Sequence, residues 1–162
     1  MAEYFINIKG VRQGQFKGDN PNLIGRADWI AGIGFTMQLI QPVSEPSGAP
    51  SGRRTYKPIQ ITKQWGAASP QIFQALATGE LLNPVIFEFT RTTPDGKEQV
   101  FQRVTLTNAL VIDVERSLDF TARHQIETDT MELEEFQLTF QRITIEDVGS
   151  GTIFTDDWSA TT

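Results

Sequence analysis

Apolar and polar residues alternate along most of the chain, and this pattern predicts a fold built mainly from β-strands. In the segment 29–39 the apolar residues recur at every second position, which is typical of a half-buried strand. The residues on that face are Trp29, Ala31, Ile33, Phe35, Met37 and Leu39. Further strands are predicted over residues 4–11, 56–64, 85–92, 98–114 and 131–146. In the last of these the apolar phase shifts near Gln141–Arg142, which indicates a β-bulge.

Two short motifs mark bends in the predicted strands. "TTPDGKE" contains Pro94-Asp95-Gly96, where proline presets φ and glycine accepts a positive φ, so a turn is predicted that joins two strands as a hairpin. Gly32 and Gly34 lie inside the predicted strand 29–39, where a glycine indicates a close backbone approach or a bend in the sheet.

One segment has helical rather than strand periodicity. "SPQIFQALATG" begins with Ser69 as the expected N-cap and Pro70 at the first helical position, and it ends at Gly79, a common C-terminal stop. The apolar residues Ile72, Phe73 and Leu76 form a narrow stripe between these ends. We therefore expect one short helix at about residues 69–78.

The loop "QPVSEPSGAPSGRR" is rich in proline, glycine and serine, which argues against regular structure. Loops of this length are uncommon unless they are functional or disordered. The expected fold is a mainly β domain over residues 1–162, either a compact β-barrel or two packed antiparallel sheets. It carries one short helix (69–78) and one long extended loop (about 41–56).

Composition narrows the classes of function. The chain has 162 residues, a net charge of −6 and a pI of about 4.8, which disfavours nucleic acid and anionic membranes as partners. It has no cysteine, so disulfides and thiolate metal sites are excluded. The first residues lack the basic and apolar regions of a secretory signal. The uncharged stretch 29–44 is too polar for a membrane span.

Residues that would support catalysis or metal binding are scarce. His124 is the sole histidine and lies in a polar segment. A catalytic triad needs a histidine base and a zinc site needs several Cys or His ligands, so neither kind of site is expected. The neighbouring carboxylates Glu134/Glu135 and Asp156/Asp157 would point to opposite faces of a strand, which makes them poor catalytic pairs. We expect no enzyme activity, no metal and no cofactor.

The charges form two separate blocks of opposite sign. Residues 53–63 carry four positive charges and no negative one, and residues 127–135 carry five negative charges and no positive one. These blocks could neutralise each other within one chain or between neighbouring copies. A contact between copies through two different surfaces is heterologous, and such contacts close into rings or extend as filaments.

Several motifs resemble, in order, those of the tube proteins of type VI secretion, the haemolysin-coregulated protein family, which are related to phage tail-tube proteins. The resemblance rests on "RRTYKPIQITKQWGAASPQIFQALATGE", "FEFTRTTPDGKEQVFQRVTLTNALV", "ELEEFQLTFQRITI" and "DDW" (156–158). It implies hexameric rings that stack into a hollow tube, a contractile sheath around the tube and a spike at its tip. It also implies effector proteins in the lumen, and export from the bacterial cytoplasm without a signal peptide.

In that family the long loop reaches the adjacent protomer, which by position is residues 41–56 here. Together with the charge blocks, this predicts the residues that contact a second copy. They are Val43, Pro46, Arg53, Arg54, Tyr56, Lys57, Glu132 and Glu134. Two alternatives remain open from the sequence: a tail-tube subunit of a phage-like contractile particle, and a monomeric β-barrel that binds a small ligand.

Overall fold

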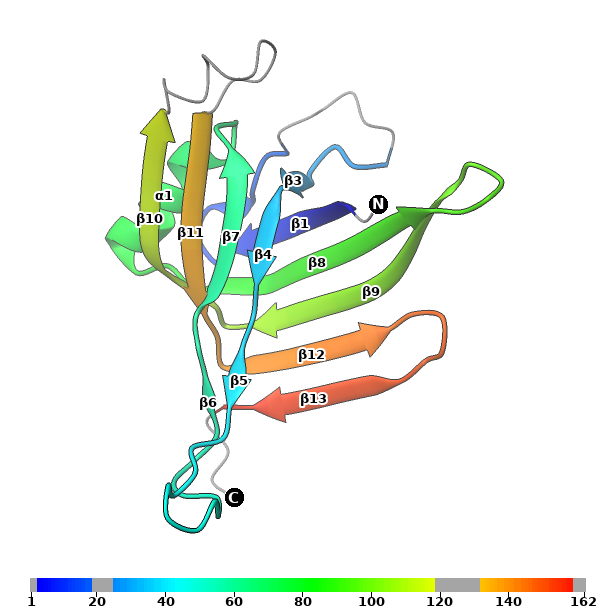
Figure 1. The fold of residues 1–162 in the computed structure, drawn as a ribbon. Helices are drawn as coiled ribbons and strands as arrows, with labels where there is room; N and C mark the ends of the chain where they lie inside the picture. The colour runs from blue at the N-terminus through cyan, green and yellow to red at the C-terminus, as the bar shows by residue number, and fades with distance from the viewer. Residues whose placement is uncertain (1–2, 19–24, 119–131, 159–162) are drawn as a thin grey trace.

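The computed structural model describes residues 3–18, 25–118 and 132–158. Strands predominate, and one short helix, α1 (Ser69–Thr78), lies between them (Figure 1). The strands are β1 (Glu3–Gly10), β2 (Gly14–Gln15), β3 (Ile30–Gly32), β4 (Gly34–Thr36), β5 (Leu39–Ile40), β6 (Thr55–Tyr56), β7 (Ile59–Gln64), β8 (Leu82–Thr92), β9 (Glu98–Thr107), β10 (Leu110–Leu118), β11 (Glu132–Thr139), β12 (Arg142–Asp147) and β13 (Ile153–Asp157).

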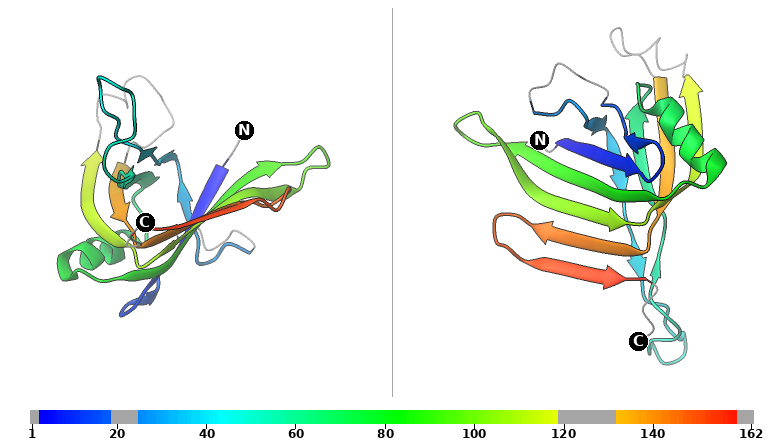
Figure 2. Two further views of the ribbon diagram at one scale, coloured as in Figure 1. Left: turned by 90° about the horizontal axis from the view of Figure 1, so that it is seen from below. Right: turned by 180° about the vertical axis from the view of Figure 1, so that it is seen from behind.

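The strands form two antiparallel sheets and a small hairpin. The larger sheet has the order β13-β12-β9-β8-β1-β2, with β3 also paired to β1, and the smaller has the order β10-β11-β7-β4. The strands of the two sheets run in crossing directions, and α1 lies beside β10 (Figure 2). The expected mainly β fold with antiparallel sheets and one short helix is confirmed. Over the residues described, the sheets do not close into a barrel.

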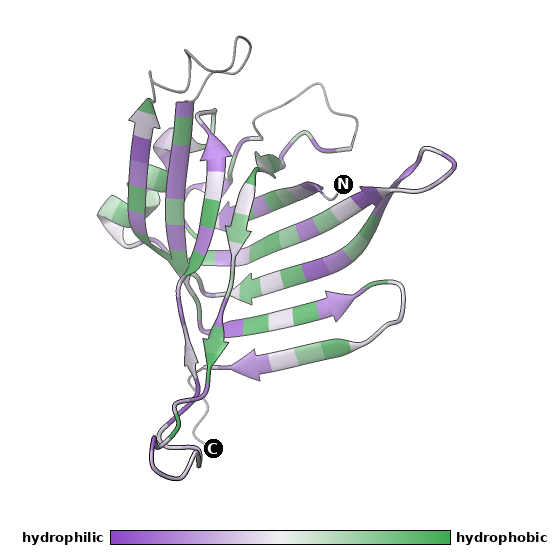
Figure 3. Ribbon diagram, viewed as in Figure 1, coloured by the Kyte–Doolittle hydropathy of each residue, from purple (hydrophilic) through white to green (hydrophobic). Residues whose placement is uncertain are grey.

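The core lies between the two sheets and α1. Green and purple bands alternate along the strands in Figure 3, as expected when one side of each strand is buried. The inward side chains come from both sheets and from α1. Fully buried examples are Ile6, Ile8, Phe87, Leu106, Ile59, Ile61, Phe136, Leu138 and Ile72.

The hairpin and the limits of the helix are where the sequence predicts them. β8 and β9 are joined by a turn in which the Thr93 amide donates to the Lys97 carbonyl and Gly96 has a φ of 82°. Helix α1 spans residues 69–78, and Gly79 ends it in the left-handed conformation with a φ of 66°.

Two details of the helix differ from the prediction. The N-cap is Ala68, and no side chain caps the helix, because the Ser69 hydroxyl accepts from the Gly66 amide and donates to Glu134 instead. The buried face holds Ser69, Ile72 and Ala75, whereas Phe73 and Leu76 are 38% and 39% exposed. Of the predicted stripe only Ile72 is buried, because the buried face is rotated toward Ser69 and Ala75.

Three predicted long strands are divided in the structure because the chain passes from one sheet to another. The segment 56–64 separates into β6 and β7. The segment 98–114 separates into β9 and β10 at Asn108, whose φ is 51°. The segment 131–146 separates into β11 and β12, so the phase change near Gln141–Arg142 marks a change of sheet instead of a bulge. A change of sheet shifts the apolar phase as a bulge does.

The predicted inward face of residues 29–39 is also only partly right. β3 pairs with β1 and β4 pairs with β7, so the chain changes sheet between Gly32 and Gly34. As a result Ile30 is fully buried while Ile33 is 60% exposed. Gly32 is closely approached by a side chain and not by the backbone that the sequence predicts, since a Cβ there would lie 2.1 Å from Cζ of Tyr4.

The described part of the chain contains no helix that is both long enough and apolar enough to cross a membrane.

Candidate subunit interface

The long loop predicted over residues 41–56 is a hairpin that projects from the body of the molecule (Figure 1). We call residues 39–56, which include β5 and β6, the arm. Its tip has its own backbone hydrogen bonds: the Ser44 amide donates to the Ala49 carbonyl (2.8 Å), and the Ser51 amide donates to the Pro42 carbonyl (2.8 Å). Val43 and Pro50 form an isolated antiparallel bridge. The arm therefore has a defined shape in the single chain.

The base of the arm is held by the last strand. Arg54 makes a bidentate contact with Asp156, with Nε 2.7 Å from Oδ2 and Nη2 2.6 Å from Oδ1. The Tyr56 hydroxyl donates to the same carboxylate at 2.7 Å. We call Arg54, Tyr56 and Asp156 the clamp. Nearby, Nη2 of Arg53 donates to the Trp158 carbonyl at 2.9 Å. The clamp joins the arm to β13.

The clamp changes the acidity of its members. Hydrogen bonds from Arg54, reinforced by Tyr56, lower the pKa of the Asp156 carboxyl below its usual range. Burial raises the pKa of the Tyr56 hydroxyl, and its hydrogen bond to Asp156 raises it further. Both shifts favour one state at neutral pH, in which a charged carboxylate accepts from a neutral tyrosine and a charged arginine. The clamp is therefore fully formed at neutral pH.

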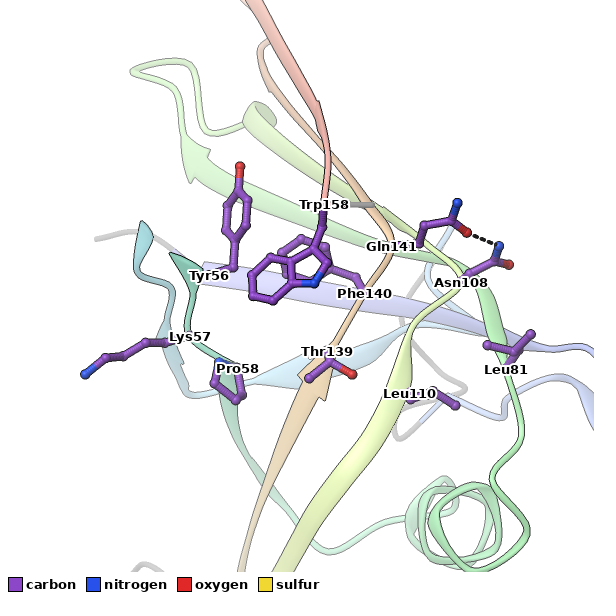
Figure 4. A pocket seen from close by; sticks show the side chains of 10 residues that line it. All are labelled: Tyr56, Lys57, Pro58, Leu81, Asn108, Leu110, Thr139, Phe140, Gln141 and Trp158. Atoms are coloured by element: carbon purple, nitrogen blue, oxygen red, sulfur yellow. Dashed lines mark hydrogen bonds between the residues drawn. The ribbon is translucent and has the colours of Figure 1, made fainter. Parts of the chain in front are cut away.

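An aromatic cluster lies at the base of the arm. The ring of Tyr56 lies 5.1 Å from that of Phe140 and 5.4 Å from that of Trp158, measured between centroids. Beside this cluster is a mainly apolar pocket of about 560 Å³ (Figure 4). We call it the base pocket. It is lined by Tyr56, Lys57, Pro58, Leu81, Asn108, Leu110, Thr139, Phe140, Gln141 and Trp158.

A group of charged residues is buried between β7, β11 and α1. Nζ of Lys63 lies 3.3 Å from Oε2 of Glu134, and both side chains are fully closed to solvent. The Ser69 hydroxyl donates to the same oxygen at 2.8 Å, and Nε of Arg116 lies 2.9 Å from the other oxygen, Oε1. The guanidinium of Arg116 stacks over Trp65 at 4.1 Å from the ring centroid. These contacts offset part of the cost of burying the Lys63 and Glu134 charges, with Oε1 of Glu134 held by the Arg116 ion pair alone.

The residues predicted to contact another copy fall into two groups. Val43, Pro46, Arg53 and Lys57 are exposed on the arm or at its base, and Glu132 is half-buried. Tyr56 and Glu134 are buried within the chain, and Arg54 is bonded to Asp156. One member of each charge block, Lys63 and Glu134, pairs within the chain. The charge blocks are thus partly neutralised inside one copy.

Sequence reasoning did not identify Asp156 as a partner of the arm. It treated Asp156 only as one of two adjacent carboxylates and as part of the "DDW" motif. Phe140 and Trp158 were likewise not assigned to the base of the arm. The sequence analysis predicts no strand over β13 (Ile153–Asp157), so it had no basis for placing these residues beside the arm.

Among the described residues, no three His, Asp or Glu side chains lie close enough to hold a metal ion. Asp156 is engaged by Arg54 and Tyr56, and His124 lies outside the described residues.

Comparison with known proteins gives consistent matches over nearly the whole chain. The family model for "Type VI secretion system effector, Hcp" matches residues 5–146. The major exported protein of Pseudomonas aeruginosa is 30% identical over 162 residues, which cover 95% of this chain and 94% of the relative.

Solved structures agree with this match. A crystal structure described as that of Hcp protein has a TM-score of 0.91 at 27% identity and covers 99% of this chain and 100% of its own. The secreted protein Hcp3 from Pseudomonas aeruginosa has a TM-score of 0.76 at 26% identity, with coverage of 99% and 100%. The chain belongs to the Hcp family of type VI secretion tube proteins.

Proposed function

We propose that this chain is the structural subunit of a type VI inner tube, formed by one tube-protein domain over residues 1–162. Six copies form a ring, and rings stack into a hollow tube. The tube is capped by a spike protein and expelled when the surrounding sheath contracts. The lumen carries effector proteins. The subunit is made in the bacterial cytoplasm, leaves the cell by this route, and has no catalytic role.

The observation that carries the proposal is the projecting arm in a chain whose family model matches residues 5–146. Val43 at the tip of the arm is 55% exposed, and Pro46, Ala49 and Pro50 beside it are also exposed. A fixed arm with apolar residues at its tip is suited to contact another molecule, because little conformational entropy is lost when it is ordered there. A contact between the arm and a different surface of the next copy is heterologous and can close into a ring.

The two sheets also leave strand edges through which copies could pair. β13 lies at one end of the larger sheet and β10 at one end of the smaller sheet. An unpaired edge offers backbone donors and acceptors to a neighbouring chain. The ring in this proposal is held by the arm together with contacts between sheet edges.

The test is the mass and shape of the purified protein in solution. Six chains of 18.1 kDa give a particle of about 109 kDa. Light scattering on a gel-filtration peak should report this mass, and negative-stain images of the same peak should show rings with an open centre. A monomer at high concentration would contradict the proposal and would favour the small-ligand alternative.

A variant at the base of the arm tests whether ring formation depends on the arm. Replacing both Arg53 and Arg54 with glutamate removes the bond to the Trp158 carbonyl and places a negative charge against Asp156. We expect the variant to stay folded and to lose the ring. The matched control is Arg91→Glu, an exposed arginine in the β8–β9 hairpin, which should form rings as the unmodified protein does.

A further inference from the structure

The base pocket lies at the corner of the molecule where the chain passes repeatedly from one sheet to another. The chain changes sheet between β6 and β7, between β9 and β10 and between β11 and β12, and residues at these crossings line the pocket. They are Lys57, Pro58, Asn108, Phe140 and Gln141. Side chains, and not paired strands, therefore form its walls (Figure 4). Its volume of about 560 Å³ is within the range of small-molecule sites, roughly 300–1,000 Å³.

Backbone hydrogen bonds hold the walls of the base pocket in place. The Gln141 amide donates to the Thr107 carbonyl (3.1 Å), and the Trp158 amide donates to the Gln141 carbonyl (2.8 Å). Leu82 and Ala109, next to the lining residues Leu81 and Asn108, exchange two hydrogen bonds of 2.8 Å. A site with fixed walls loses little conformational entropy when it binds a ligand. The pocket is therefore preformed in the single chain.

The interior of the base pocket favours a flat aromatic group. The rings of Phe140 and Trp158 lie 6.3 Å apart between centroids, with an angle of 61° between their planes. Phe140 is buried, whereas Trp158 is 39% exposed, so part of its indole surface is open to a ligand. Leu81 and Leu110 add aliphatic surface. Aromatic rings prefer such offset or edge-to-face neighbours, and the aliphatic side chains add apolar contact area.

The polar edge of the base pocket favours an anionic group. None of the ten described residues that line it is acidic, although the chain has a net charge of −6. Lys57 extends from the edge (Figure 4), and its ammonium group makes no hydrogen bond or ion pair with the described residues. The indole nitrogen of Trp158 has no acceptor in the part of the chain that the structure describes. The nearby Asp156 carboxylate is already paired with Arg54. Charge complementarity therefore selects an anion.

We propose that the base pocket binds a small aromatic carboxylate, with its ring against Phe140 and Trp158 and its carboxylate paired with Lys57. The inference goes beyond the proposed function, because it adds a ligand site to a structural subunit. It does not depend on ring assembly, since every residue that lines the pocket belongs to one chain. The site lies outside the space between the two sheets, so it is not the calyx of a ligand-binding barrel.

Calorimetric titration of the purified protein with two matched probes tests the site. Naphthoate carries two fused rings and a carboxylate, and naphthamide has the same rings with a neutral amide. Naphthoate should bind with a Kd below about 1 mM. Naphthamide should bind roughly threefold or more weakly, because it lacks the charge that pairs with Lys57.

Two variants locate the binding site. Lys57→Met should lower the affinity for naphthoate to that for naphthamide and leave the affinity for naphthamide unchanged. Lys97→Met, at an exposed lysine of the β8–β9 turn, is the matched control and should change neither affinity. Leu81→Trp places a larger side chain in the pocket and should weaken both probes. Circular dichroism checks the fold of each variant, and the comparison of Lys57→Met with Lys97→Met remains decisive if Leu81→Trp does not fold.

The outcomes separate this inference from the proposed function, because light scattering on the same samples reports their mass. Rings that bind neither probe at 1 mM, a ceiling set by the expected Kd of about 1 mM, overturn the ligand site and leave the tube proposal standing. Binding that a folded Leu81→Trp variant does not weaken lies elsewhere and also overturns the site. Equal affinities of Lys57→Met and Lys97→Met for naphthoate overturn the pairing with Lys57. A monomer that binds naphthoate as described supports the site and contradicts the ring.

Discussion

Lys63 and Glu134 form an ion pair that is fully closed to solvent, with Nζ 3.3 Å from Oε2. The two residues lie on the paired strands β7 and β11 and are direct partners in register. A buried charge without its partner is costly, whereas an apolar pair of similar volume can be as stable as the ion pair. The loss of stability is therefore expected to be largest when only one member of the pair is replaced.

Removing one partner should destabilise the protein by about 3–5 kcal/mol. Each single variant leaves a buried charge with only part of its contacts: Lys63→Met leaves Glu134 with Arg116 and Ser69. Glu134→Leu leaves Lys63 with the Gln64 carbonyl and the Ser69 hydroxyl. The double variant Lys63→Met with Glu134→Leu should recover most of the loss. Denaturant unfolding at a fixed protein concentration measures this, and a double variant no more stable than the singles would contradict the explanation.

The clamp at the base of the arm should open in acid. The pKa of Asp156 is lowered in the folded state, so its stabilisation is complete above the ordinary aspartate pKa of about 4. It is lost as the pH falls below that value through the lowered pKa. Asp156→Asn removes the charge at every pH, so its free energy of unfolding should equal that of the unmodified protein only in acid.

Hydrogen exchange can follow the clamp at single amides. The Lys57 amide donates to the Gln38 carbonyl at the arm base (3.0 Å) and should lose protection in Asp156→Asn at neutral pH. The Thr93 amide in the β8–β9 turn donates to Lys97 (2.8 Å) and serves as the control. Unchanged protection of Lys57 in the variant would mean that the clamp does not hold the arm.

Glu80 holds the turn between β1 and β2 against the end of α1. Its Oε2 accepts from the amides of Arg12 (3.0 Å) and Gln13 (2.8 Å), and its side chain is buried. Although burial opposes ionisation, these backbone hydrogen bonds lower the pKa of the carboxyl. Glu80→Ala should cost about 1–3 kcal/mol, because two partly buried backbone donors lose their acceptor.

Glu80→Gln is the informative comparison at this position. The glutamine keeps one acceptor oxygen, so its loss of stability should be smaller than that of Glu80→Ala. Because the pKa of Glu80 is lowered on folding, the carboxylate stabilises the fold above the ordinary glutamate pKa of about 4.3, and this effect fades as the pH falls through the lowered value. The difference between Glu80→Gln and the unmodified protein should therefore shrink in acid, and thermal unfolding at several pH values tests it.

Elements marked by local residues could be predicted from the sequence. Pro70 and Gly79 define the helix, and Pro94-Asp95-Gly96 defines the hairpin turn, because each acts on the backbone at its own position. The sheet to which each strand belongs could not be predicted. The positive φ of Asn108 turns the chain from β9 into β10, and asparagine only permits this conformation without requiring it.

The candidate interface could be predicted only in part, because the sequence shows local features but not pairings between distant residues. The composition of the arm identified it, but its clamp joins residues 102 positions apart, and no local pattern encodes such a pairing. The buried pair does have a local signal in the sequence. Lys63 is in phase with Ile59 and Ile61, and Glu134 is in phase with Phe136 and Leu138. A charged residue in phase with buried neighbours on each of two strands indicates an internal ion pair.

Gly32 is required by the ring of Tyr4. A Cβ at position 32 would lie 2.1 Å from Cζ of Tyr4. The ring has little freedom to move, because it stacks on Phe89 at 5.3 Å between centroids and its hydroxyl donates to the Gly34 carbonyl. Gly32→Ala should therefore cost about 1–3 kcal/mol through overpacking.

Gly149→Ala is the matched control, since its added Cβ would meet nothing closer than 3.7 Å. We expect it to change stability by less than about 0.5 kcal/mol. In a chain of this size each kcal/mol shifts Tm by roughly 2–4 °C, so the two variants should differ clearly in thermal unfolding at equal concentration. If the two midpoints agree, Tyr4 can move aside, and the sheet change between β3 and β4 does not depend on a glycine. If Gly32→Ala alone is lowered, the contact with Tyr4 is what restricts this position to glycine.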